Sequence, residues 1–261
     1  MNQGEPLAFG AFADLYDSVR PEYPKQLVDF ILDFASLPKR SQVIEVGAGT
    51  GKATLELARR GLQITCLEPS PQMAEILRRN CSGFPNVMVH VSTFESWPPP
   101  TEKFGLLVAA QSWHWVNSEV RLRRAADVLS HSGTIALFWN QAPQPPLELK
   151  HAFEAAYRRC APDLLSNSNL NPRASYLDEP LAVSGIFTEL TVRKYYTEQV
   201  FTSSHYLGLL DTYADYRNLP SQQHARLFDA LDQLIGSAGG VVSLWYGSLL
   251  YLARLRESRS S

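Results

Sequence analysis

The sequence contains few cysteines and no long apolar run. Its three cysteines among 261 residues are odd in number and widely spaced, which disfavours both a disulfide framework and a zinc site. No apolar stretch approaches the roughly 18 residues that a membrane-spanning helix needs, and residues 1–12 lack the basic and apolar segments of a secretory signal. These absences predict a cytoplasmic protein with reduced thiols, no bound metal and no membrane partner.

A surplus of charge of either sign is also missing. The chain has 24 Lys and Arg residues against 26 Asp and Glu, so it lacks the cationic excess that neutralises a phosphate backbone. We therefore expect a small-molecule substrate and no nucleic acid. What is present is a globular composition, 45% hydrophobic and 19% charged. This length fits one enlarged α/β domain over residues 1–261 better than two independent domains.

Short apolar segments alternate with amphipathic segments along the first 140 residues. Strands are expected at 43–46, 62–67, 87–91, 106–110 and 134–139, and helices at 24–35, 52–60, from 71 onward, and 117–129. Strands that alternate with helices predict a doubly wound α/β fold with a parallel sheet and right-handed crossovers. In such sheets, ligands bind beyond the carboxyl ends of the strands.

The pattern changes after residue 140. We expect helices at 147–160, 203–213 and 221–235, an Asn/Ser-rich loop at 166–171, and strands at 187–200 and 241–252. The expected organisation is a cofactor-binding core over 9–140 with substrate or lid insertions at 141–180 and 202–238. The helices of the second insertion are candidates for a lid.

Three alternate glycines, Gly47, Gly49 and Gly51, follow the first strand and open the next helix. Such a turn lets the backbone bend sharply and approach a ligand without a Cβ in the way. A dinucleotide-binding turn has its third glycine at the sixth position, which is Lys52 here, and no Walker-type phosphate loop is present. The pattern indicates a nucleotide-type ligand other than a dinucleotide, with a plain strand-to-helix turn as the alternative.

Two carboxylates accompany the glycine turn. Glu45 lies inside the first strand, where a buried carboxylate is costly unless it is paired, so a cationic ligand would give it a partner. Glu68 follows the second strand, where a carboxylate can accept both hydroxyls of an adenosine ribose. The alternative for Glu68 is a residue that stabilises a helix N-terminus.

These residues resemble class I S-adenosylmethionine-dependent methyltransferases, and more narrowly the trans-aconitate methyltransferase-like branch. The resemblance is good over residues 9–140. It rests on FADLY at 12–16, VRPEYP at 19–24, VIEVGAGTG at 43–51, LEPS at 67–70 with Met73, and AQSWHW at 110–115. The family implies a Rossmann-like sheet of seven strands, mostly parallel with an antiparallel last strand, and S-adenosylmethionine as the cofactor.

The resemblance also implies roles for individual residues. Those expected to bind the cofactor are Tyr16, Arg20, Glu45, Gly47, Gly49, Gly51, Glu68, Pro69, Met73, Thr93, Phe94, Glu95 and Gln111. Among them, Glu68 would hold the ribose, Pro69 or Met73 the adenine face, and residues 93–95 the adenine edge. Arg20 would pair with the methionine carboxylate, unless it is a solvated loop charge. Gln111 would lie beside the sulfonium.

Three residues are candidates for contact with the acceptor during catalysis: Tyr16, Trp113 and His114. His114 is either a general base or a structural histidine, and Trp113 is either a cation–π partner or part of the core. Methyl transfer needs alignment more than acid–base chemistry, because the cofactor is already activated. The acceptor is a carboxylate, a hydroxyl or an activated carbon. The rival hypotheses are an NAD-type oxidoreductase on the same fold and a catalytically silent regulatory protein that binds the cofactor.

Overall fold

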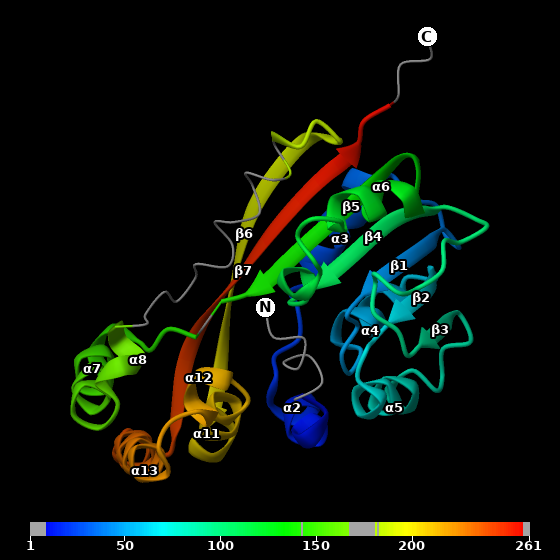
Figure 1. Cartoon of the computed structure of the whole chain (residues 1–261). Coiled ribbons are helices and arrows are strands. Elements are labelled where there is room, and N and C mark those ends of the chain that lie inside the picture. The colour runs from blue at the N-terminus through cyan, green and yellow to red at the C-terminus, as the bar shows by residue number, and fades with distance from the viewer. Residues whose placement is uncertain (1–8, 142, 167–180, 182, 258–261) are drawn as a thin grey trace.

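The computed structural model describes residues 9–141, 143–166, 181 and 183–257. Seven strands form one sheet in the order β3-β2-β1-β4-β5-β7-β6 (Figure 1). The strands are β1 Gln42–Val46, β2 Gln63–Leu67, β3 Val87–His90, β4 Phe104–Ala110, β5 Leu129–Asn140, β6 Phe187–Thr202 and β7 Val241–Leu255. The first five are parallel, and β7 is antiparallel to both of its neighbours. This confirms the predicted fold.

The helix before β1 and the helices between the first five strands begin and end close to the predicted positions. They are α3 Lys25–Ala35, α4 Lys52–Arg59, α5 Pro71–Asn80 and α6 Arg121–Val128. The N-cap of α5 is Ser70, whose Oγ accepts from the Met73 N–H at 3.4 Å. The predicted helix at 117–129 is shorter than expected, because 117–120 form a turn and Leu129 already belongs to β5.

A short helix that the sequence pattern did not predict precedes α3. It is α2 Ala13–Val19, which follows a 3₁₀ turn at Phe9–Phe12. Helix α2 docks on α5 through side chains: Arg79 pairs with Asp14 at 3.2 Å, and Asn80 donates to Asp17 at 3.1 Å. A seven-residue helix is too short to be stable alone, so these tertiary contacts hold it in place.

Two hydrophobic cores cover the two faces of the sheet. On one face α3 and α4 pack on the strands, with Leu27, Ile31 and Leu57 at most 2% exposed. On the other face α6 packs through Ala125 and Val128. Each fully buried aliphatic side chain of the size of leucine contributes roughly 1.5–3 kcal/mol to stability. The cores therefore hold the strand ends, and the loops that follow them, in fixed positions.

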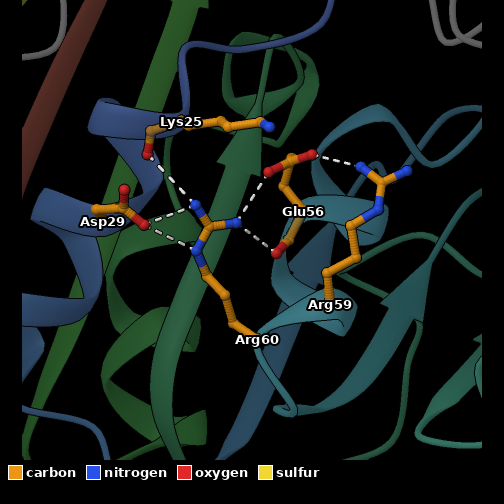
Figure 2. A network of polar contacts seen from close by, with 5 residues as sticks. All are labelled: Lys25, Asp29, Glu56, Arg59 and Arg60. Carbon is orange, nitrogen blue, oxygen red and sulfur yellow. Dashed lines mark hydrogen bonds and ion pairs between the residues drawn. The ribbon is translucent and has the colours of Figure 1, made fainter.

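A polar network also joins α3 to α4, as Figure 2 shows. The Arg60 guanidinium donates to Asp29 at 2.6 Å and to Glu56 at 2.8 Å, and Arg59 donates to the same glutamate. Partial burial raises the pKa of Glu56, but the hydrogen bonds from Arg60 and Arg59 outweigh it and hold the pKa below its usual value. This network lies at the end of α4 away from the glycine turn, so it supports the scaffold only.

Strands β6 and β7 continue past the end of β5 and carry a helical cap. Only 248–254 of β7 pair with β5, while β7 pairs with β6 over its whole length. The helical cap consists of residues 196–202 and 241–247 of these strands with α7 Leu147–Cys160, α8 Pro162–Ser166, α11 Ser203–Asp211, α12 Ala214–Arg217 and α13 Ser221–Ser237. It is at the lower left of Figure 1. Part of the predicted insertion, including residues 167–180 and most of the Asn/Ser-rich loop, lies outside the described residues.

None of the helices within the described part of the chain has both the length and the apolar character needed to cross a bilayer. In the same part there is no group of three His, Cys, Asp or Glu side chains that could hold a metal ion. The three cysteines are buried and free.

Candidate active site

The glycine turn follows β1 and is held against β2. The Gly47 N–H donates to the Leu67 carbonyl at 2.8 Å, and its backbone adopts a φ of +67°. A Cβ at this position would lie 2.4 Å from the Cβ of Ser112, so only glycine fits. Gly49 also has a positive φ, of +58°, but faces open space. Gly51 instead faces Leu77 of α5 and lines neither of the cavities described below, so it shapes the turn without approaching a ligand.

Glu68 links the glycine turn to the start of α5. Its Oε2 accepts from the Gly49 N–H at 2.8 Å, and its Oε1 accepts from the Ser70 N–H at 2.9 Å. The side chain is 6% exposed. Burial raises the pKa of this carboxyl group, while the two backbone hydrogen bonds oppose the rise. Each carboxylate oxygen retains a second lone pair that can accept a hydrogen bond from a ligand.

Two adjoining cavities lie at the carboxyl ends of β1, β2 and β4. The larger has a volume of about 140 Å³ and is lined by Tyr16, Val46, Gly47, Gly49, Glu68, Pro69, Met73, Ser92, Thr93, Phe94, Glu95, Ala110, Gln111, Ser112, Trp115 and Val116. The smaller has a volume of about 40 Å³ and is lined by Tyr16, Arg20, Pro21, Tyr23, Glu45, Gly47, Ala48, Gly49, Thr50, Lys52, Ala53, Ala110, Gln111, Asn140 and Tyr213. Five residues, Tyr16, Gly47, Gly49, Ala110 and Gln111, line both cavities, so the two adjoin. This is where the fold is expected to bind its ligand.

The larger cavity gathers the residues expected around adenine. Pro69 and Met73 come from the start of α5, and Thr93, Phe94 and Glu95 follow β3. The Thr93 Oγ1 accepts from the Ser96 N–H at 3.1 Å, and the Glu95 Oε1 accepts from the Asn117 N–H at 2.7 Å. These bonds fix the loop after β3, so its backbone and side chains present a fixed wall to the cavity.

In the smaller cavity, Glu45 is a buried carboxyl group with one short hydrogen bond. Its side chain is 1% exposed, and the Thr54 hydroxyl donates to its Oε2 at 2.7 Å. Burial raises the pKa of Glu45 to about 8, against the lowering effect of the Thr54 bond, and the nearby Glu68 adds to the rise. A cation placed in this cavity would stabilise the ionised form of Glu45.

The hydroxyl of Thr50 also lies in this region and is an unsatisfied polar atom. Thr50 lines the smaller cavity and is 1% exposed, yet its Oγ1 has no hydrogen-bond partner among the described residues. A buried polar atom without a partner is costly. A polar ligand in the smaller cavity would supply that partner.

Arg20 joins the N-terminal segment to the helical cap. Its Nε donates to the Thr212 Oγ1 at 2.8 Å, and its Nη2 donates to the Thr212 carbonyl at 3.0 Å. The guanidinium lies over the Tyr213 ring at 4.0 Å and over the Tyr16 ring at 4.9 Å. Arg20 is therefore not a solvated loop charge. Burial raises the pKa of Tyr16, while the charge of Arg20 lowers it.

Gln111 lies where the two cavities meet and has an unusual backbone. Its φ of +63° is rare for a residue with a side chain. Two hydrogen bonds hold it: its N–H donates to the Phe138 carbonyl, and its Nε2 donates to the Asn140 carbonyl at 2.9 Å. The side-chain Oε1 remains available as an acceptor.

Asn140 is a site residue that the sequence did not predict. It ends β5 and lines the smaller cavity. The Ser248 hydroxyl donates to its Oδ1 at 2.6 Å, so its amide nitrogen has donors left for a ligand. A polar residue at the carboxyl end of a central strand was the only sequence signal for it. Other lining residues that the sequence did not single out include Tyr23, Thr50, Lys52 and Ser112.

Two of the three predicted catalytic residues line neither cavity. Trp113 is fully buried and packs against Phe94 in the core, so its ring does not reach an acceptor in this structure. His114 is half-buried; its Nδ1 accepts from the Trp139 indole at 3.3 Å, and its ring lies against Trp115. Of these three candidates, Tyr16 is the one that lines the cavities, and it lines both.

Comparison with known proteins agrees with this geometry. A family model described as a methyltransferase domain matches residues 43–133, which include the glycine turn and Glu68. The chain contains a class I S-adenosylmethionine-dependent methyltransferase domain. S-adenosylmethionine is the cofactor of such domains, and the two cavities of this methyltransferase domain are its candidate cofactor site.

Relatives of the methyltransferase domain occur in bacteria and fungi. An uncharacterized methyltransferase of Mycobacterium tuberculosis is 34% identical over 134 residues, which cover 51% of this chain and 52% of that protein. An uncharacterized methyltransferase of Schizosaccharomyces pombe is 25% identical over 222 residues, 84% of each chain. The chain thus spans about half the length of the mycobacterial relative that it matches.

Solved structures share the fold at low sequence identity. The Haemonchus contortus phosphoethanolamine N-methyltransferase 2, in complex with S-adenosylhomocysteine, has a TM-score of 0.59 at 11% identity over 98% of this chain and 61% of that chain. The cyclase SpnF has a TM-score of 0.57 at 17% identity over 98% and 97%. Proteins named for different reactions therefore share this architecture, and the fold alone does not fix the reaction.

Proposed function

We propose that this protein binds S-adenosylmethionine across the two adjoining cavities and transfers its methyl group to a small molecule. The observation that carries the proposal is the arrangement around Glu68. This buried carboxylate lies between the glycine turn and the start of α5, lines the larger cavity, and keeps acceptor capacity on both oxygens beyond its two backbone hydrogen bonds. Ribose hydroxyls are the donors that such a carboxylate would bind.

The remaining cofactor residues follow from this placement. Pro69 and Met73 would pack on the adenine, with residues 93–95 at its edge. In the smaller cavity, Glu45 would face the ammonium group, and the orphaned hydroxyl of Thr50 would receive a partner. Arg20 lines the same cavity and would face the methionine carboxylate with the donors that Thr212 leaves free.

The chemistry requires little of the protein beyond alignment. When bound, S-adenosylmethionine supplies a methyl group activated by positively charged sulfur. Tyr16, which lines both cavities, would help to exclude water from the reacting groups. Gln111, held by the Asn140 carbonyl, keeps its Oε1 beside the junction of the cavities. His114 would serve as a general base only if a side-chain movement brought it to the acceptor, so we place acceptor binding on Tyr16, Asn140 and Tyr213.

The acceptor is proposed to be a small molecule in the cytoplasm. The narrow cavity beside Asn140 and the near-neutral net charge of −2 support this better than a nucleic acid. The helical cap would select the acceptor, since it contributes Tyr213 to the cavity wall. We keep the trans-aconitate methyltransferase-like branch as the proposed subgroup, on the motifs at 12–24 and 110–115.

Titration calorimetry with S-adenosylmethionine, S-adenosylhomocysteine and NAD tests the proposal. We expect the first two ligands to bind and NAD not to bind. Incubation with a small-molecule extract should then release S-adenosylhomocysteine, detected by mass spectrometry. Binding of NAD alone would favour the oxidoreductase, whereas cofactor binding without turnover on any extract would favour the silent regulatory protein.

A further inference from the structure

Strand β6 lies at the outer edge of the sheet (Figure 1). It runs from Phe187 to Thr202 and, within the described part of the chain, pairs with β7 alone. An edge strand presents a row of backbone N–H and C=O groups that can pair with another strand. Sixteen residues make this edge far longer than the usual strand of 5–6 residues.

Along one face of β6, exposed apolar or aromatic side chains alternate with charged side chains. Val192 is 45% exposed, Tyr196 65% and Val200 67%. On the neighbouring strand Trp245, which pairs with Glu198, is 50% exposed. Apolar side chains that recur at this spacing along an edge are unusual on a monomeric protein, where edges are normally shielded by charge or irregularity.

The charges between these apolar residues are arranged symmetrically. Lys194 and Glu198 lie on the same face, two positions before and two positions after Tyr196. Two β6 strands could pair in antiparallel fashion with the two-fold axis at Tyr196. Lys194 of each copy would then lie opposite Glu198 of the other copy, which gives two Lys–Glu pairs. The same register places Val192 opposite Val200.

The other face of the strand is compatible with this register. Arg193 would lie opposite Gln199, and Tyr195 opposite Thr197, so no pair of like charges meets. Directly opposed residues of opposite charge stabilise an antiparallel pair, and like charges destabilise it. A slip of the register by two residues would remove both Lys–Glu pairs.

We propose that β6 is the interface of a two-fold symmetric dimer, in which two copies of this chain join edge to edge around Tyr196 into one continuous sheet. Two-fold dimers use the same patch on both subunits, and a patch with this internal symmetry is self-complementary. The occupant of the exposed edge is thus a second copy of the chain. The interface is remote from the glycine turn, so it is independent of the proposed methyl transfer.

Charge reversal tests the register. By sedimentation velocity, we expect the wild-type chain to form a concentration-dependent species of twice its 29.2 kDa mass. Lys194→Glu would place two glutamates opposite each other at both symmetric positions, and we expect a dimer dissociation constant at least tenfold higher. The double variant Lys194→Glu/Glu198→Lys restores opposite charges and should regain the dimer. Lys39→Glu, an exposed lysine before β1, is the matched control and should have no effect.

A cysteine on the symmetry axis gives an independent test. Directly opposed residues of antiparallel strands have Cα atoms about 4.5–5.5 Å apart, which a disulfide can span. We expect Tyr196→Cys to form a covalent dimer under mild oxidation. Val192→Cys, equally placed on the exposed face, would meet Val200 and should not crosslink. The natural cysteines are buried and provide little background.

A wild-type chain that stays monomeric at high micromolar concentration would overturn the proposal. So would a dimer that Lys194→Glu leaves unchanged, or one that the double charge swap does not restore, because another surface would then form it. Circular dichroism and cofactor binding of each variant establish that it is folded, so loss of the dimer is attributable to the edge.

Discussion

The cofactor half of the molecule and the helical cap are built on different principles. In the cofactor half, residues 43–133 bring polar groups to the carboxyl ends of parallel strands, and buried groups such as Glu45 and Glu68 face a cavity. The cap is packed around an apolar core that includes Leu209, Leu227 and Leu231, and it reaches the cavity through Tyr213. From this contrast we expect the cofactor half to bind the cofactor and the helical cap to select the acceptor.

One junction connects the two regions beside the cavity. Arg20, between Tyr16 and Tyr213, is bonded to Thr212 at the end of α11. A second link runs through the sheet, where Ser248 of β7 bonds Asn140 of β5. Changes in the cofactor half are therefore expected to reduce cofactor affinity strongly, and changes at the junction more weakly.

The largest effect is expected from Glu68→Ala. The variant loses a buried carboxylate whose hydrogen bonds to donors are worth about 1.5–3 kcal/mol each, so we expect cofactor affinity to fall about a hundredfold or more. Titration calorimetry measures it, with the exposed Glu75→Ala as the control. Affinity within twofold of wild type would mean that the ribose binds elsewhere.

Gly47→Ala and Gly49→Ala separate folding from binding within the turn. A Cβ at residue 47 meets the Cβ of Ser112 at 2.4 Å, whereas at residue 49 it meets nothing within 4 Å. Both positive φ values cost roughly 1–2 kcal/mol for alanine, and the clash at residue 47 adds about 1–3 kcal/mol. In urea unfolding, we expect Gly47→Ala to be clearly less stable. We expect Gly49→Ala to lose about tenfold in cofactor affinity, because its methyl group enters the cavity. Equal losses of stability would contradict the geometry.

The pH dependence of cofactor binding is expected to report on Glu45. In the folded protein its pKa is about 8, against 4.5 as the ordinary value. The folded state thus holds the proton more tightly than the unfolded chain, and stability falls as pH rises from about 4.5 to about 8. If the ionised form binds the ammonium group of the cofactor, affinity should rise about eightfold from pH 6 to pH 7, where that ammonium group still keeps its proton, while Glu45→Gln shows no such rise. A wild-type profile as flat as that of the variant would remove Glu45 from the ammonium site.

The smallest effect is expected at the junction. Arg20→Lys keeps the charge but loses the paired bonds to Thr212, so we expect a cofactor affinity three- to fivefold lower, about 1 kcal/mol. Hydrogen exchange should be faster in α2 and at the end of α11, and unchanged in β1. Thr212→Val, which removes one acceptor of the same pair, is the companion variant. Unaltered exchange in both variants would show that the bonds between Arg20 and Thr212 do not hold the cap in place.

Sequence patterns predicted best those candidate site residues that belong to one strand–turn–helix segment of the chain. The spacing of Gly47, Gly49 and Glu68 located the turn and its acidic partner, because strand, turn and helix follow one another directly in the chain. Gln111 follows β4 and Asn140 ends the neighbouring strand β5, but only Gln111 was predicted, from the resemblance. The contact of Arg20 with Thr212 joins residues 192 positions apart and has no signal in the sequence. Trp113 was ambiguous for the same reason, since its burial depends on Phe94 and on α6.

The sequence by itself determined the alternation of strands and helices over residues 24–140, the glycine turn and the carboxylate that follows β2, since hydrophobic periodicity and glycine spacing act over a few residues. Only the tertiary structure decided which polar side chains meet in the cavities. It also decided that Trp113 packs in the core and that β6 is an edge strand. The physical reason is that burial, the pKa of Glu45 and strand pairing depend on neighbours that the chain brings together from distant positions.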